Sequence, residues 1–301
     1  MENHIDKSQN RTLASKGFED VLLDFILSRQ AMMCTQNTIR QYRYLLLRTI
    51  NWCEQHEITC PEEITSKLIR QFFSELFDQG CSDSYVHSYA RVLKTFIRFM
   101  VEENYLAEEI RVPMPKIADK QLLVYNESQV KQILFYCQNR RDLAFILFML
   151  DTGLRNAEVR KLKWDDINIK TGVVRVIEGK GRKFRIVVTG VNTRRALLKY
   201  RSDIDSSPTN PVFQTKSGSR FTAPGLRSWM MRLSERAKIH ITPHALRRTF
   251  ATLSIRAGMD VFQLQILLGH SSLEMTRHYV SLVDEDLIRT HKAHGPVDNI
   301  M

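Results

Sequence analysis

Apolar positions recur every three or four residues through the first hundred residues of the chain, which is the spacing of amphipathic helices. The pattern predicts four helices, over residues 17–29, 35–55, 61–77 and 82–104. The last helix is the most regular, and its inward face carries Val86, Tyr89, Leu93, Phe96, Ile97 and Met100. We therefore expect an all-helical N-terminal domain over residues 17–108, preceded by a polar, flexible segment at 1–16.

A break in the helical pattern follows at residues 109–123. Pro113 and Pro115 lie within it, and prolines two apart disfavour helix and favour extended chain. We predict that this segment is a linker between two domains.

Beyond the linker, the pattern mixes helical and strand periods. Short β-rich runs at 164–169, 173–178 and 184–188 are separated by glycine-containing turns, which predicts a three-stranded antiparallel sheet. Helices are expected around this sheet, over 127–138, 141–152, 154–162, 191–201, 223–238, from Pro243 towards Gly258, before Gly269, and over 284–294. The expected fold class is thus two domains, one all-α and one mixed α+β, mostly helical with a small sheet, over 124–301.

Composition is that of an ordinary globular protein. The chain has 301 residues, of which 43% are hydrophobic and 26% charged, enough for about two domains that each bury a core. The longest apolar run, 144–150, is too short to cross a bilayer, and the N-terminus lacks the pattern of a signal peptide. Five cysteines without a Cys-x-x-Cys pair argue against a disulfide framework or a zinc site and favour the cytoplasm.

Net charge is +11, which suggests a polyanionic partner. Residues 1–108 hold 12 Lys and Arg against 15 Asp and Glu, whereas residues 109–301 hold 32 against 18. The C-terminal two-thirds therefore carry the excess of positive charge.

The helical N-terminal domain nevertheless has basic residues on one face. Four lie on the outer face of helix 82–104 and have no acidic residue among them, and two lie on helix 35–55. A solvated charged face is the ordinary explanation, and contact with DNA phosphates is the alternative that we favour. The candidate DNA-binding residues are Arg40, Arg43, His87, Arg91, Lys94 and Arg98.

Candidate chemistry is concentrated near the C-terminus. Thr242 and Pro243 are a helix-start signal, which places His244 and Arg247 on one face of the helix that follows. His270 comes directly after Gly269, and Tyr279 follows nine residues later. Such residues can handle a phosphate group, although a surface helix with scattered charges shows the same pattern.

Two further motifs lie upstream. Arg155 stands at a predicted helix start after Thr152-Gly153-Leu154, and Lys180 stands between two glycines at the tip of a predicted β-turn. Taken singly, each is equally well explained as a solvated surface side chain. In chain order, however, Arg155, Lys180, His244, Arg247, His270 and Tyr279 form a set.

This set resembles that of the tyrosine recombinases, the integrase and Xer group of site-specific DNA recombinases. The matching motifs are Thr-Gly-Leu-Arg-x-x-Glu, Gly-Lys-Gly, His-x-Leu-Arg and Leu-Gly-His, followed by the tyrosine. Arg248 departs from the family, in which many members have histidine at this position. The resemblance covers the whole chain, because a helical, SAM-like core-binding domain and a linker also fit.

The resemblance implies strand cleavage through a 3′-phosphotyrosyl link, without metal or ATP. Arg155 and Arg247 would bind the non-bridging oxygens of the scissile phosphate, and His270 would add a donor. Tyr279 would be the nucleophile, His244 its general base and Lys180 the general acid. We expect Glu158 to support Arg155, and Lys183 and His278 to lie outside the set.

The resemblance also implies the partners. They are double-stranded DNA at a specific recombination site, bound by two protomers, and a homotetramer, or a related recombinase, in the synapse. Because the first domain begins near residue 17, we expect no arm-binding domain before it, and we expect residues 284–294 to dock on a neighbouring protomer. The biological role would be integration, transposition or resolution. Two alternatives stay open, a type IB topoisomerase and a DNA-binding regulator without catalysis.

Overall fold

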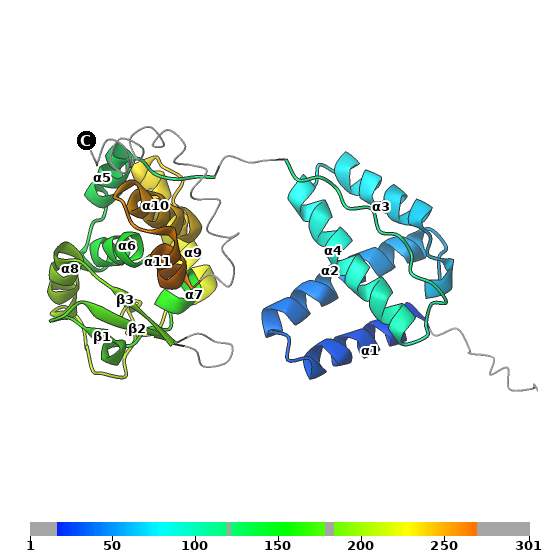
Figure 1. Ribbon diagram of the computed structural model, residues 1–301, viewed down its shortest axis with the longest axis horizontal. Coiled ribbons are helices and arrows are strands. Elements are labelled where there is room, and N and C mark those ends of the chain that lie inside the picture. Colours follow the sequence, from blue (N-terminus) through cyan, green and yellow to red (C-terminus); the bar gives the residue numbers. More distant parts are fainter. Residues whose placement is uncertain (1–16, 119–121, 178–183, 270–301) are drawn as a thin grey trace, which may run out of the picture. The chain divides into compact units, whose positions relative to one another are not determined.

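The computed structural model describes residues 17–118, 122–177 and 184–269 (Figure 1). The chain divides into two compact units, Met1–Lys120 and Gln121–Met301, and each has its own hydrophobic core. The described part is mostly helical with one small antiparallel sheet, as the periodicity predicted. Among the described residues, no helix is long and apolar enough to cross a membrane.

The first unit is built from four helices and one 3-10 turn. The elements are α1 (Phe18–Ala31), α2 (Gln36–Gln55), η1 (Pro61–Glu63), α3 (Ser66–Asp78) and α4 (Asp83–Glu102). Thr35, Thr65 and Ser82 each accept a backbone N–H of the first turn of the helix that follows. The expected single helix over 61–77 is wrong, because Ile64 and Thr65 are extended and Thr65 caps a new helix, α3.

Aromatic rings fill the centre of this unit. Phe25 of α1 makes edge-on contacts with Phe96 and Phe99 of α4 and with Tyr42 of α2, at centroid distances of 5.1 to 5.2 Å. Edge-on aromatic pairs add to the stabilisation from burial alone. The packing fixes α2 and α4 beside each other, so the outer faces of these two helices form one surface.

The segment after α4 is extended, as its prolines predicted, but it is bonded to the first unit. The Ser66 hydroxyl donates to the Arg111 carbonyl oxygen, and the Ala118 N–H donates to the Asp83 carboxylate. Nδ1 of His87 lies 2.9 Å from the Pro115 carbonyl oxygen. Residues 111–118 therefore run along α3 and α4 (Figure 1).

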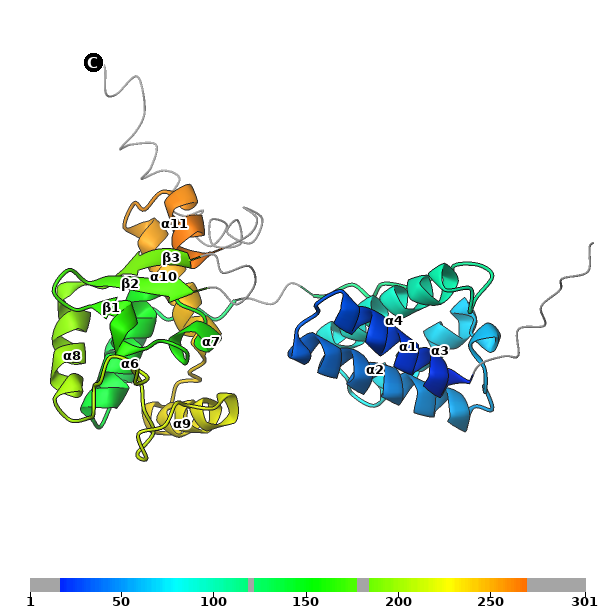
Figure 2. The same ribbon diagram turned by 90° about the horizontal axis from the view of Figure 1, so that it is seen from below.

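The second unit packs helices around α6. Its helices are α5 (Glu127–Phe135), α6 (Arg140–Thr152), α7 (Asn156–Val159), α8 (Val191–Arg201), α9 (Ala223–Ala237), α10 (Pro243–Arg256) and α11 (Val261–Leu268). Helix α6 contacts α8, α10 and the sheet, and it is buried along most of its length (Figures 1 and 2). The expected helix over 154–162 is only one turn long in its α-helical part, α7, after which the chain turns at Arg160 and Lys161.

The sheet lies at one side of this unit, in the order β1-β2-β3. Its strands are β1 (Ile167–Asn168), β2 (Val173–Ile177) and β3 (Phe184–Val188), and Val173 pairs with Val188. The first predicted run, 164–169, begins as the 3-10 turn η2 (Trp164–Asp166). Val174, Val176 and Val187 face the core and are at most 1% exposed.

Candidate active site

The site is built where α6 ends and α7 begins. Gly153 ends α6 in the left-handed conformation, with φ of 59°. A Cβ atom at this position would stand 2.2 Å from Phe250 Cδ1 and 3.0 Å from Leu268 Cδ2. Glycine is therefore required both by the backbone angle and by the close approach of α10 and α11.

Arg155 follows as the residue that caps α7. Its backbone N–H donates to Glu158 Oε2 at 2.8 Å, and its Nη1 donates to Glu158 Oε1 at 3.1 Å. Its Nη2 donates to the carbonyl oxygen of Gly269 at 2.8 Å. The side chain is 38% exposed, so the guanidinium lies at the surface of the unit.

Arg247 enters the same place from α10. The Thr242 hydroxyl accepts the Ala245 N–H and Pro243 occupies the first turn, which confirms the helix start predicted from the sequence. Arg247 is only 5% exposed. Its Nη1 donates to the Gly153 carbonyl oxygen at 2.6 Å and its Nη2 to the Leu268 carbonyl oxygen at 2.8 Å.

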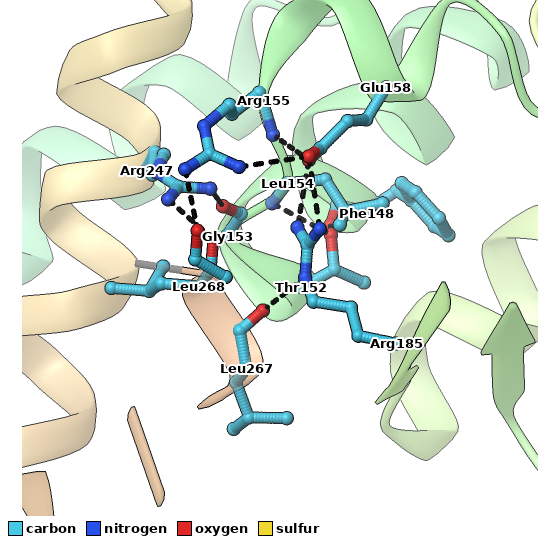
Figure 3. A network of polar contacts seen from close by, with 11 residues as sticks. Phe148, Thr152, Gly153, Leu154, Arg155, Glu158, Arg185, Arg247, Leu267 and Leu268 are labelled. Carbon is cyan, nitrogen blue, oxygen red and sulfur yellow. Dashed lines mark hydrogen bonds and ion pairs between the residues drawn. The ribbon is translucent and has the colours of Figure 1, made fainter. Parts of the chain in front are cut away.

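A third arginine, Arg185 of β3, completes the group (Figure 3). Its Nε donates to the Leu267 carbonyl oxygen at 2.8 Å. Its Nη1 and Nη2 donate to the two oxygens of Glu158, at 3.0 and 2.8 Å. Three guanidiniums thus bind three successive carbonyl groups, 267 to 269, at the C-terminal end of α11, where the helix dipole favours cations.

Glu158 is the carboxylate at the centre of this group. Its side chain is 11% exposed, and burial alone would raise its pKa. The hydrogen bonds from Arg185 and from the Arg155 N–H, together with the two positive charges, outweigh burial and lower the pKa below its ordinary value. Glu158 is therefore ionised at neutral pH and orients both arginines, which agrees with the supporting role expected for it.

His244 stands on the exposed side of α10, one helical turn before Arg247. Surrounding protein atoms remove part of the hydration of its ring and lower its pKa, and the charges of Arg248, Arg247 and Arg155 lower it further. A neutral imidazole beside two guanidiniums can accept a proton from a group that binds there.

Among the six expected catalytic residues, Arg155, His244 and Arg247 thus lie in one place. Lys180, His270 and Tyr279 lie outside the described residues, as do Lys183, His278 and the expected helix at 284–294. In the chain, residue 270 follows Gly269, whose carbonyl oxygen Arg155 binds. Within the described ranges, no group of three or more His, Cys, Asp or Glu side chains is placed to hold a metal ion.

The candidate DNA-binding residues of the first unit differ in their surroundings. Arg40, Arg43, Arg91 and Lys94 are exposed on α2 and α4. Of these four, Arg91 helps to line a groove of about 250 Å³, together with Tyr42. His87 is partly buried against Pro115. The basic residues on the outer face of α4 were expected to have no acidic partner. This is wrong for Arg98, which pairs with Glu102 at 2.9 Å, one turn later on the same helix.

Arg185 is the residue that the sequence interpretation missed. Strand alternation could have found it, because residues 185 and 187 of a strand share one face, and Val187 is buried. An arginine on the inward face of an otherwise apolar strand requires a buried acidic partner. That partner is Glu158.

Comparisons with known proteins identify the family of the chain. The model of the phage integrase family matches residues 124–286. A tyrosine recombinase XerC of Oceanobacillus iheyensis is 29% identical over 280 residues, covering 87% of this chain and 91% of the relative.

Solved structures show the same fold. The Tn1549 transposon integrase (aa 82–397), in complex with circular intermediate DNA, has a TM-score of 0.71 at 20% identity, covering 88% of this chain and 95% of that one. A lambda integrase tetramer bound to a Holliday junction has a TM-score of 0.73 at 17% identity, covering 89% and 78%. The chain belongs to the phage integrase family of tyrosine recombinases.

Proposed function

We propose that the chain is a site-specific DNA recombinase that cleaves and rejoins DNA strands through a 3′-phosphotyrosyl intermediate. The observation that carries the proposal is the convergence of Arg155 and Arg247 on the carbonyl groups at the end of α11. Residue 270 follows directly in the chain, and Tyr279 comes nine residues later. Membership of the phage integrase family supports the same activity.

The two arginines have the chemistry that the reaction needs. A phosphodiester resists nucleophiles because its oxygens are negatively charged. Arg155 and Arg247 bind the non-bridging oxygens and stabilise the charge that grows on them as the fifth ligand joins phosphorus. The guanidinium stays protonated at any working pH, so neither arginine competes as a proton donor.

Proton transfer falls to the remaining residues. His244, with its lowered pKa, accepts the proton of the Tyr279 hydroxyl as the phenolate attacks phosphorus. Lys180 donates a proton to the departing 5′-oxygen, and His270 donates a hydrogen bond to the phosphate. The phosphotyrosyl ester keeps the energy of the broken bond, so attack by the 5′-hydroxyl of another strand reseals the DNA without ATP or metal.

The two units then have separate tasks. The second unit is the catalytic domain, over 124–301, and the first is a helical core-binding domain over 17–108 whose exposed basic residues on α2 and α4 contact DNA phosphates. The partner is double-stranded DNA with a specific site, bound by two protomers and joined to a second site in a tetramer. The lambda integrase tetramer on a Holliday junction supports this arrangement.

The experiment first needs a DNA site. Duplexes that bind the Tyr279→Phe variant are selected from a random-sequence pool and remade with a nick inside the bound region. The protein is then incubated with this nicked duplex in EDTA without nucleotide, and protein that migrates with DNA in denaturing gels is measured. We expect an adduct with the parental chain and none with Tyr279→Phe, although both bind.

Two alternatives give different results in this assay. A type IB topoisomerase would relax supercoiled plasmids that lack the selected site, at the same rate as plasmids that contain it. A regulator without catalysis would bind the selected duplex and form no adduct. Either result would overturn the proposal.

A further inference from the structure

Arg185 lies in the site but is not one of the six expected catalytic residues. It is 8% exposed at its side chain, and it joins three elements, β3, α7 and α11 (Figure 3). Its guanidinium therefore connects these three elements directly.

The first contact is with Glu158. Both carboxylate oxygens accept hydrogen bonds from Arg185, and the same two oxygens accept the Nη1–H and the backbone N–H of Arg155. Arg185 therefore fixes the carboxylate, and the carboxylate fixes the guanidinium of Arg155. Without Arg185, Glu158 could turn towards water and Arg155 would lose its orientation.

The second contact is with the end of α11. Arg185 Nε binds the carbonyl oxygen of Leu267, next to the carbonyl groups of Leu268 and Gly269 that the two phosphate-binding arginines hold. These bonds hold the last carbonyl groups of α11 in place. His270 is the next residue in the chain after Gly269.

The third link is through the chain itself. Phe184 begins β3 and Arg185 is its second residue, so Arg185 lies five positions after Lys180. Its side chain anchors the start of the returning strand to the rest of the unit. Arg185 therefore connects the start of β3, which follows the Gly-Lys-Gly motif in the chain, to α7 and α11.

We propose that Arg185 is a positioning residue for strand cleavage, which locks Glu158, Arg155 and the end of α11 together through its guanidinium. The inference rests on the proposed recombinase function. Arg185 acts through other residues and does not bind the phosphate itself. Its loss should slow the chemical step and leave the affinity for DNA unchanged.

The test measures two quantities on the selected, nicked duplex: the dissociation constant, and the first-order rate of adduct formation with protein in excess. We expect Arg185→Gln to keep the dissociation constant of the parental chain and to slow the rate about 10²-fold, the loss typical of misplaced catalytic groups. Arg185→Lys should lose less, because an ammonium group still pairs with Glu158 but does not reach both partners. The matched control is Arg175→Gln, an exposed arginine on β2 whose loss should leave the rate unchanged.

A purely structural role is separated by the kinetics. Partial unfolding lowers the amount of adduct, whereas a positioning role lowers the first-order rate constant of the folded molecules. Added guanidinium ion should also restore the rate of Arg185→Ala, at concentrations that do not unfold the parental chain. It should not change the rate of Arg175→Ala.

The outcomes decide between the two claims. If the parental chain and Arg175→Gln form no adduct, the proposed function fails. If both form adduct and Arg185→Gln forms it at the parental rate constant, the function stands and the positioning role is refuted. A lower yield at an unchanged rate constant, without guanidinium rescue, also refutes it.

Discussion

Gly153 is the position where a single methyl group should disturb the whole site. Gly153→Ala places a Cβ atom 2.2 Å from Phe250 Cδ1 and 2.7 Å from Phe250 Cε1, on a residue with φ of 59°. Its neighbour Leu268 supplies one of the carbonyl oxygens that Arg247 binds. The substitution therefore forces α10 and α11 away from the end of α6.

The expected cost has two parts. A side chain in the left-handed conformation costs roughly 1–2 kcal/mol, and overpacking of a buried ring costs about 1–3 kcal/mol. Together they predict a loss of about 2–5 kcal/mol in the free energy of unfolding of the second unit. Gly258→Ala is the matched control, because its φ is 90° and nothing lies within 4 Å of its added Cβ atom. Its free energy of unfolding should fall only by the cost of the left-handed backbone, roughly 1–2 kcal/mol.

The assay is urea unfolding of the full chain, followed by tryptophan fluorescence. Of the three tryptophans, only Trp52 lies in the first unit, so a Trp52→Phe background reports on Trp164 and Trp229 of the second. Equal losses for Gly153→Ala and Gly258→Ala would refute the close packing of α6 against α10. So would a Gly153→Ala variant that cleaves DNA at the parental rate.

Three further predictions concern charge. Because the folded-state pKa of Glu158 lies below its ordinary value, its carboxylate stabilises the fold fully above about pH 4.5 and loses this effect as the pH falls through the folded-state pKa. Glu158→Gln should thus be less stable than the parental chain by about 3 kcal/mol at pH 7, with a gap that narrows in acid, and an unchanged gap down to pH 3 would contradict this. Arg248→Gln removes a cation near His244 and should raise the pKa of that imidazole towards 6.5 in an NMR titration, whereas Lys131→Gln should not. Arg91→Gln should reduce the slope of log affinity for DNA against log salt by about 0.9, and Lys67→Gln on α3, another exposed cation, should leave the slope as it is.

Local signals in the sequence predicted most of the second unit. Thr242 with Pro243 marked the start of α10, and Gly153 marked the end of α6, because capping and left-handed backbone depend on nearby residues alone. The three strands followed from their turns and their β-branched residues. The helix expected over 154–162 was too long, since the pairing of Arg155 with Glu158 caps a single turn and the chain then bends into the sheet.

Long-range contacts were beyond the reach of pattern alone. That Arg185 lies against Glu158 and the end of α11 depends on how β3 packs against α11, which no local spacing encodes. Local spacing also gave no sign of the contact of His87, whose ring nitrogen lies against the Pro115 carbonyl oxygen of the segment after α4. The motif residues could be named from the sequence, but the long-range contacts that orient their side chains could not.

The most direct test of the recombinase mechanism is to identify the residue that carries the DNA. After reaction with the nicked duplex in EDTA, the adduct is digested with nuclease and trypsin and analysed by mass spectrometry. Cleavage after Arg277 and Arg289 releases a peptide of residues 278–289, with Tyr279 as its only tyrosine. We expect a nucleotide linked through its 3′-phosphate to this tyrosine. A nucleotide on any other residue, or linked through a 5′-phosphate, would contradict it.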